Sequence, residues 1–333
     1  MKFAEIIIKP ISAFGTPLKG DTIFGHFYWQ LIYDPSLING NLDQLSKVYG
    51  HEPFVIFSSA FPRLEEGWLF PRPALPLHRL NFDKKENERG DCFQNLKQLK
   101  ARKAKKWIFV RNQEGNFKID LRQVEFLTEE EATKRISSKE YFPNGIKKLI
   151  IRLPQPHNSI NRLTFTTGEG FAPYQMENFW FHPRLKLSVF FLYKEEILPI
   201  ENIKKAFQRI GETGFGRDAS SGLGLFGVEE VVEHQVPAPA SVLYTLSPYV
   251  PQQEEYKKIL YQPFVRFGRH GSYLVLSENP FKNPVFMADE GAVLETVSPK
   301  GPYVGRALDN LSKTEEKTIG QGFSIVFPLE GLL

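Results

Sequence analysis

The sequence predicts an α+β protein in which four strands and two helices follow one another in the order βαββαβ. Two observations carry this prediction. Short segments of alternating or continuous apolar residues are typical of strands, and two segments between them repeat apolar residues at a spacing of three to four, which is typical of helices. A glycine-rich loop just before the fourth strand is a third observation, and it places a candidate binding site within this order.

The first strand and the first helix are expected close to the N-terminus. Residues 3–9 form a short apolar run that predicts a buried strand. A turn-rich loop follows, and Asp21 or Thr22 is expected to begin a helix as its N-cap. One apolar stripe with a period of 3.6 residues supports this helix, and it consists of Ile23, Phe24, Phe27, Tyr28, Leu31 and Ile32.

The remaining elements complete the βαββαβ order. Residues 55–59 are expected to form the second strand, and residues 185–193 alternate in the manner of a third. A second helix is predicted at 200–210 from the spacing of its apolar residues, and residues 223–232 are expected to form the fourth strand. This order is the ferredoxin-like arrangement, which RNA-recognition domains also use.

Two further regions lie outside this unit. Residues 62–184 form a large insertion between strands two and three, and a basic run from Lys97 to Arg111 lies within it. A boundary is expected at residues 237–239, so that a domain at 1–236 is followed by a smaller one at 240–333. The second domain is expected to be β-rich, with strands near 243–250, 264–267 and 273–276, and a degenerate ferredoxin-like copy is one possibility for it.

Composition limits the classes of protein that the chain can belong to. With 333 residues, 41% of them hydrophobic, it is long enough for a substantial core, and its net charge of +4 leans toward an anionic partner. Cys92 is the single cysteine, which excludes an internal disulfide and a cysteine-based zinc site. We expect no metal and no cofactor. A cytoplasmic location without a membrane span is expected because no run of about 18 apolar residues occurs.

The most informative segment runs from Gly211 to Gly227 and contains six glycines. Glycine reaches positive φ freely and leaves amide N–H groups uncovered, so such a loop can present a nest of donors to phosphate oxygens. Arg217 and the two serines beside it could add further donors. The predicted binding residues of this loop are Gly214, Phe215, Gly216, Arg217, Ser220, Ser221 and Gly222.

Part of the loop, residues 214–219, also fits the glycine fingerprint of dinucleotide-binding domains. That fingerprint requires a strand before it and a helix after it. Here the order is reversed, because a helix is predicted before the loop and a strand after it. A phosphate-backbone binder is therefore favoured over a nucleotide cofactor, and a loop that binds nothing remains the other alternative.

Four segments carry a resemblance to a known family: residues 12–26, 57–62, 158–166 and 214–224. The first runs from Ser12-Ala-Phe14-Gly to Gly25-His26, and the third contains Asn161-Arg162-Leu-Thr164-Phe-Thr166. Over nearly its whole length the chain resembles the RAMP superfamily of CRISPR RNA-binding proteins, and within it the fourth subunits of type III-A (Csm) effector complexes. The glycine loop alone marks only the superfamily, whereas the first and third segments are more specific.

This resemblance implies a subunit that caps one end of an effector complex. Such a subunit grips the 5′ handle of the crRNA and joins the large signalling subunit to the repeated backbone RAMP subunits, as a binder rather than a nuclease. In a ferredoxin-like fold the loop after strand one can lie near the loop before strand four, which would bring Phe14, Thr16 and Lys19 to the glycine loop. The polar segment 161–166 supplies further candidates for phosphate or base-edge contacts, namely Asn161, Arg162, Thr164 and Thr166.

Two alternatives to this function stay open. Some RAMP proteins cleave repeat RNA by metal-free acid–base chemistry, for which His26 would be the candidate group, although a packing role suits this histidine better. A scaffold that binds only proteins is the second alternative. The sequence contains no Ser-His-Asp order, no GxSxG and no Walker motif, so we do not expect an enzyme.

Overall fold

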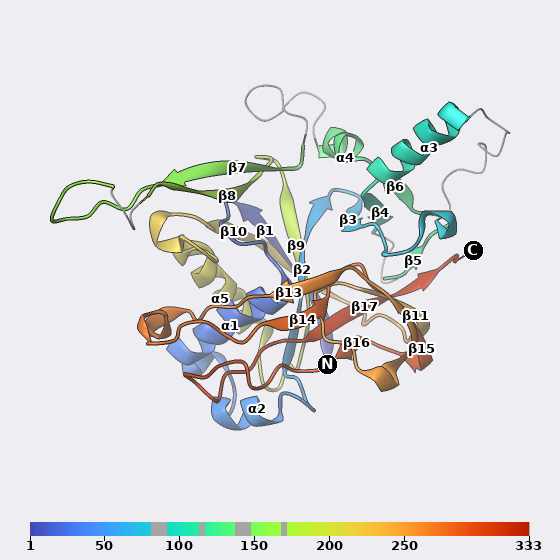
Figure 1. Ribbon diagram of the computed structural model, residues 1–333. Helices are drawn as coiled ribbons and strands as arrows, with labels where there is room; N and C mark the ends of the chain where they lie inside the picture. Colours follow the sequence, from blue (N-terminus) through green and yellow to red (C-terminus); the bar gives the residue numbers. More distant parts are fainter. Residues whose placement is uncertain (81–91, 113–116, 137–147, 168–171, 333) are drawn as a thin grey trace.

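The computed structural model describes residues 1–80, 92–112, 117–136, 148–167 and 172–332 (Figure 1). The helices are α1 (Gly20–Tyr33), α2 (Leu42–Val48), α3 (Cys92–Ala104), α4 (Glu129–Ile136) and α5 (Ile200–Thr213). The strands of the first 240 residues are β1 (Lys2–Pro10), β2 (Val55–Leu64), β3 (Gly67–Pro71), β4 (Trp107–Arg111), β5 (Ile119–Asp120), β6 (Glu125–Leu127), β7 (Ile150–His157), β8 (Tyr174–Phe181), β9 (Lys186–Tyr193) and β10 (Phe226–His234). The later strands are β11 (Ala240–Thr245), β12 (Tyr256–Leu260), β13 (Pro263–Arg266), β14 (Val285–Ala288), β15 (Val293–Lys300), β16 (Tyr303–Gly305) and β17 (Phe323–Glu330).

A large antiparallel sheet in the order β10-β1-β9-β2-β3-β4-β6 forms the centre of the molecule. Its first four strands, with α1 between β1 and β2 and α5 between β9 and β10, are compatible with the predicted βαββαβ arrangement. The strands β3, β4 and β6 come from the predicted insertion and continue the same sheet beyond β2. The α+β class is confirmed.

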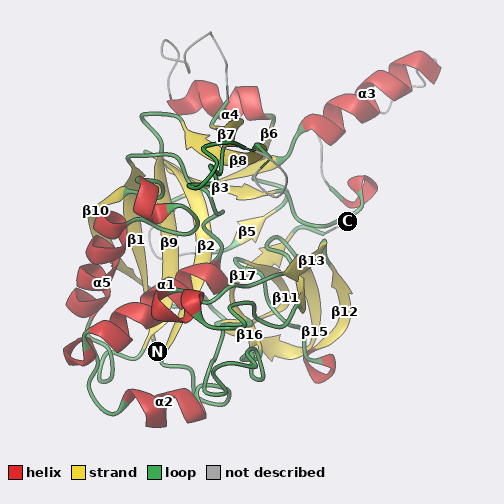
Figure 2. Ribbon diagram, turned by 60° about the vertical axis from the view of Figure 1, so that its left-hand side comes forward, coloured by secondary structure: helices red, strands yellow, loops and turns green. Residues whose placement is uncertain are grey.

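The two long helices cover one face of this sheet, where Figure 2 shows α1 and α5 lying against β10, β1, β9 and β2. Aromatic side chains fill the space between them. The ring of Phe57 in β2 lies 5.0 Å from that of Phe27 in α1 and 5.5 Å from that of Phe207 in α5, measured between centroids. Burial of rings of this size supplies much of the hydrophobic stabilisation of the layer.

The other face of the sheet is covered by the C-terminal strands. They form a second sheet in the order β12-β15-β11-β17-β16, with β5 paired in parallel to β17. Phe327 of β17 packs against Phe190 of β9 and Phe70 of β3, at 5.6 and 5.8 Å between ring centroids. One hydrophobic core therefore crosses the segment 237–239, and the predicted division into two domains stays a prediction.

The glutamate that interrupts the first apolar run lies inside the large sheet. Glu5 is fully buried, and its carboxylate accepts hydrogen bonds from Trp68 Nε1 (2.8 Å) and from the Ser188 hydroxyl. The His234 ring lies 3.0 Å from the same carboxylate. Burial alone would raise the pKa of Glu5, but these partners outweigh burial and lower it. A buried carboxylate is tolerated here because its oxygens have partners.

The β7–β8 hairpin projects from the body of the molecule, as Figure 1 shows. Its two strands pair with each other over eight residues, and most side chains of β7 are exposed. Two of these exposed residues are prolines, Pro154 and Pro156. A backbone bridge between Phe179 and Phe14 attaches the base of the hairpin to the loop after β1.

Two local predictions are wrong. Neither Asp21 nor Thr22 caps α1, because the helix already begins at Gly20, and the Asp21 carboxylate instead pairs with Arg266 at 2.5 and 2.8 Å. Residues 273–276 do not form a strand but belong to a short 3-10 turn, Ser272–Leu276. Among the helices of the described residues, none has both the length and the hydropathy to cross a membrane.

Replacing Phe24 by alanine should destabilise the protein strongly. The ring is buried in α1 and lies 4.9 Å from the Tyr49 ring, so its loss leaves a cavity. We expect the free energy of unfolding, measured by urea denaturation, to fall by about 3 to 5 kcal/mol. The matched control is Ile32→Ala on the exposed side of the same helix, which should cost less than about 1 kcal/mol. Equal losses in the two variants would contradict the packing described here.

Candidate nucleic-acid interface

The glycine-rich loop connects α5 to β10 and is built from left-handed residues. Positive φ occurs at Gly214, Gly216, Gly222 and Gly224, and also at Asp218. Two backbone hydrogen bonds close the loop at its base, from Phe215 N–H to the Gly224 carbonyl (3.0 Å) and from Gly224 N–H to the Ala13 carbonyl (2.7 Å). The second of these bonds joins the loop to the segment after β1.

Gly216 is one of several glycines of the loop where a side chain cannot be accommodated. Its φ is +80°, and a Cβ at this position would lie 2.5 Å from the Cβ of Thr16. The Thr16 hydroxyl accepts a hydrogen bond from the Arg217 amide at 3.0 Å. The loop after strand one was expected to lie near the glycine loop, and for Thr16 this is confirmed. Its hydroxyl supports the glycine loop by accepting the Arg217 amide.

His26 of α1 is a second support for the loop. Its Nε2 accepts the Gly216 N–H at 3.1 Å, and its ring lies 4.4 Å from the Phe215 ring. Burial lowers the pKa of His26 to about 4, and the nearby Lys282 ammonium contributes to this. The imidazole is therefore neutral at physiological pH, and its proton resides on Nδ1 because Nε2 is the acceptor.

Arg217 ties the glycine loop to the base of the β7–β8 hairpin. Its Nη2 donates to the Glu177 carbonyl (3.0 Å) and to Oδ1 of the buried Asn178 (2.7 Å). Its Nε lies 3.2 Å from the Asp218 carboxylate. The guanidinium, which the sequence suggested as a further donor to phosphate, thus has a structural role and remains only partly exposed.

The outward side of the loop presents backbone and hydroxyl donors. Ser220, Ser221 and Gly222 are exposed. The amides of Asp218, Ala219 and Ser220 have no hydrogen-bond partner among the described residues. Consecutive uncovered N–H groups of this kind are suited to an anion such as a phosphate oxygen.

Four predicted site residues do not face solvent, and one of them is the buried Gly214. Phe14 and Phe215 are buried, and their rings lie 6.2 Å apart in the core beneath the loop. A stacking contact between either ring and an RNA base is not compatible with this burial. Sequence alone could not separate a ring beneath the loop from a ring on it.

Lys19 is the fourth of these residues, and it points toward the C-terminal half of the chain. Its ammonium pairs with Asp289 at 2.5 Å and with Glu290 at 2.7 Å. Burial raises the pKa of Glu290 to about 7, although the Lys19 ammonium opposes this rise. Lys19 therefore joins α1 to the segment before β15, and its charge is not offered to RNA.

The segment 161–166 forms the tip of the β7–β8 hairpin, away from the glycine loop. The Asn161 side chain accepts the Leu163 amide at 2.9 Å, and the hydroxyls of Thr164 and Thr166 lie 2.9 Å from each other. Arg162 is exposed, and no described residue forms a hydrogen bond or an ion pair with it. These polar groups shape the tip, and Arg162 is the one whose charge is available.

The apolar part of this tip was not predicted from the sequence. Leu163 is 92% exposed and Phe165 is 83% exposed, the latter with a positive φ of 53°. A signal for these residues was present in the sequence, because two large apolar side chains interrupt a polar turn. Folding alone does not place such side chains far from a core.

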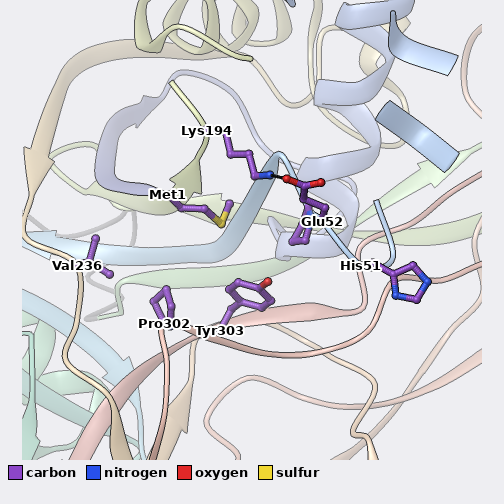
Figure 3. A pocket seen from close by; sticks show the side chains of 8 residues that line it. Met1, His51, Glu52, Lys194, Val236, Pro302 and Tyr303 are labelled. Carbon is purple, nitrogen blue, oxygen red and sulfur yellow. Dashed lines mark hydrogen bonds and ion pairs between the residues drawn. The ribbon is translucent and has the colours of Figure 1, made fainter. Parts of the chain in front are cut away.

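Two other features lie apart from these residues. The basic run from Lys97 to Arg111 falls on α3 and β4, and Figure 1 shows α3 on the opposite side of the molecule from the hairpin tip. A pocket of 380 Å³ contains the Glu52–Lys194 ion pair (Figure 3). None of the predicted site residues lines this pocket; its walls are Met1, His51, Glu52, Pro53, Lys194, Val236, Pro302 and Tyr303. In the described ranges, no three His, Cys, Asp or Glu side chains gather as a metal site would require.

Solved structures resemble the chain over almost its full length. One is a crystal structure of a Csm1-Csm4 cassette in complex with pppApA, with a TM-score of 0.57 and 19% identity, covering 99% of this chain and 98% of the other. A second is the Csm3-Csm4 subcomplex of the type III-A CRISPR-Cas interference complex, with a TM-score of 0.56, 14% identity and coverage of 98% and 99%. The chain has the fold of Csm4.

A third structure, a Csm1-Csm4 cassette in complex with cA4, gives a TM-score of 0.58 at 16% identity, with coverage of 99% and 98%. No protein-family model and no curated protein sequence matches the chain. The resemblance inferred from four sequence segments is thus confirmed at the level of the fold.

Gly216→Ala should disturb the loop more than Gly222→Ala. Both glycines have positive φ, which costs an alanine about 1 to 2 kcal/mol. Only at Gly216 does the new Cβ also overlap Thr16, which should add about 1 to 3 kcal/mol, whereas no atom lies within 4 Å of a Cβ at Gly222. Thermal denaturation of the two variants measures the difference, and equal melting temperatures would contradict this geometry.

His26 should make stability depend on pH between about 6.5 and 4. In this window the unfolded chain takes up a proton on His26, while the folded chain remains neutral because burial lowers its pKa to about 4. The contribution of the neutral His26 to the free energy of unfolding is therefore fully present above pH 6.5, and it is lost as the pH falls to about 4. His26→Phe keeps a ring beside Phe215 but does not titrate, so its unfolding free energy should fall less steeply in this window. Parallel pH profiles for the two proteins would exclude this account.

Proposed function

We propose that this chain is a non-catalytic crRNA-binding subunit of a type III-A CRISPR effector complex. It holds the 5′ repeat-derived handle of the crRNA and bridges the large signalling subunit to the backbone subunits. The fold supports this proposal, because its solved neighbours are Csm4 chains that were crystallised with Csm1 and with Csm3. The two protein partners would be the counterparts of Csm1 and Csm3.

The observation that carries RNA binding is the uncovered side of the glycine loop. Three consecutive amides, at Asp218, Ala219 and Ser220, and the hydroxyls of Ser220 and Ser221 offer donors to phosphate oxygens. Thr16, His26 and Arg217 hold the loop from the other side, so these donors are already in place before a ligand arrives. Preorganised donors lose little conformational entropy on binding.

The hairpin tip supplies a second set of contacts of a different kind. Arg162 offers a charge to a phosphate, and the exposed Phe165 ring offers a face on which a base can stack. The base of the same hairpin is bonded to the glycine loop through Arg217. Loop and tip can therefore act on one RNA strand as parts of a single connected support.

The position of His26 favours a binder over a nuclease. General acid–base cleavage needs a histidine whose nitrogen is free to exchange a proton near neutral pH. Nε2 of His26 instead accepts the Gly216 amide, and burial lowers its pKa to about 4. A proton on Nε2 would break the hydrogen bond that supports the loop.

The proposal is tested by purifying the tagged chain from its native cells and sequencing the RNA that accompanies it. We expect short CRISPR RNAs that share one repeat-derived 5′ end, together with a large signalling subunit and backbone subunits. Bound proteins without RNA would support the scaffold alternative. Unprocessed repeat transcripts that the pure protein then cuts would support the nuclease.

Arg162→Gln should weaken the binding of single-stranded RNA and make it less sensitive to salt. Each phosphate neutralised on a single strand releases about 0.7 counterion, so the slope of log K against log salt should decrease by about that amount. The control is Lys313→Gln, an exposed lysine outside the proposed site. Fluorescence anisotropy over a salt series measures both, and an unchanged slope for Arg162→Gln would remove this residue from the interface.

A further inference from the structure

Residues 261–288, called here the aromatic ribbon, carry a composition that differs from the rest of the C-terminal half. These 28 residues contain six aromatic side chains, three cations and a single carboxylate, Glu278. β13 near its start and β14 at its end form an antiparallel pair. Hydrogen bonds from Lys282 N–H to the Gly268 carbonyl and from His270 N–H to the Pro280 carbonyl, both 2.8 Å, continue the pairing beyond β13.

The ribbon exposes apolar side chains on its outer face. Residues of β13 alternate, so that Val265 and Phe267 point outward, while Arg266 between them pairs with Asp21 of α1. Phe267 is 78% exposed and Phe281 is 64% exposed. The guanidinium of Arg269 lies 5.8 Å from the Phe281 ring, in the manner of a cation–π pair. This outer face consists of Val265, Phe267, Arg269, Phe281 and Phe286.

The inner face of the ribbon reaches the residue that supports the glycine loop. Lys282 lies close enough to His26 for its charge to help lower the histidine pKa, and His26 Nε2 accepts the Gly216 amide. The same lysine lies near Asp21, but no described residue forms an ion pair or a hydrogen bond with its ammonium. A partly buried cation with no partner among the described residues therefore lies on the inner face of the ribbon, close to the histidine that supports the glycine loop.

The ribbon, with its cations and exposed rings, thus meets the support of the glycine loop at His26. Single-stranded nucleic acids are bound by this combination, in which cations follow the phosphates and aromatic faces receive successive bases. A single carboxylate among 28 residues also suits a polyanion. The sparsity of acids and the continuity with the glycine loop favour RNA over a protein surface.

We propose that the RNA strand held at the glycine loop continues over the outer face of the aromatic ribbon. Two of its bases stack on Phe267 and Phe281, and Arg269 contacts a phosphate. This inference rests on the proposed function, since it extends the path of the same RNA.

The experiment compares the full-length chain with the double variant Phe267→Ala/Phe281→Ala, using single-stranded RNA that begins with the repeat-derived handle. Fluorescence anisotropy should show affinity reduced by about 25-fold or more, because stacking on one ring contributes about 5-fold or more per base. Phe267→Tyr/Phe281→Tyr keeps both rings and should retain the native affinity. The matched control is Leu276→Ala, which removes an exposed side chain of the same segment outside the outer face.

A second measurement locates the RNA directly. Handle RNA carrying 5-iodouridine at successive positions, irradiated in complex with the native chain, should form crosslinks to Phe267 or Phe281. Crosslinks confined to other segments would overturn the proposal.

Each remaining outcome also decides the matter. If the native chain binds handle RNA and the alanine double variant binds it equally well, the ribbon proposal fails while the proposed function stands. If the double variant keeps its RNA affinity but loses a partner subunit in co-purification, the outer face is a protein interface and the proposal fails. If the native chain binds no RNA, the proposed function fails, and the ribbon proposal fails with it.

Discussion

The central constraint on this structure is that the strands of the large sheet are apolar on both faces. In β9, Phe190 faces the rings of Phe70 and Phe327, whereas Phe191 faces Phe57 and the helices. Neither face can be left to water, so the sheet must be covered twice. The helices α1 and α5 cover one side and the C-terminal sheet covers the other, which makes the C-terminal part an integral layer of the fold.

The candidate interface depends on how the glycine loop is attached to the helices and the large sheet. α5 and β10 fix the two ends of the glycine loop, and three side chains determine its shape: Thr16 and His26 from other elements, and Arg217 of the loop itself. Each of these side chains bonds to backbone or to a buried amide rather than to solvent. The candidate binding groups are therefore backbone amides on the outer side, and the side chains with the most suggestive chemistry serve as supports.

Sequence patterns were sufficient for the elements whose neighbours are local. The apolar stripe of α1 could be predicted because the helix buries one face. The strands β1 and β9 could be predicted because they bury both faces and are therefore almost continuously apolar. The partners of Lys19 could not be predicted, because Asp289 and Glu290 lie 270 and 271 residues away in the chain. The burial of Phe14 and the exposure of Phe267 were equally hidden, since a phenylalanine has the same local pattern in a core and on a binding surface. Such long-range contacts decided which predicted residues reach the interface.

The prolines of the projecting hairpin limit how a partner can engage it. A proline has no N–H, so Pro154 and Pro156 fit β7 only where the nitrogen points away from β8, toward the strand's free edge. That edge thus lacks two consecutive donors that an incoming strand would need in order to extend the sheet. Any partner that engages β7 would therefore do so through side chains, and the hairpin is protected from adding strands of other molecules.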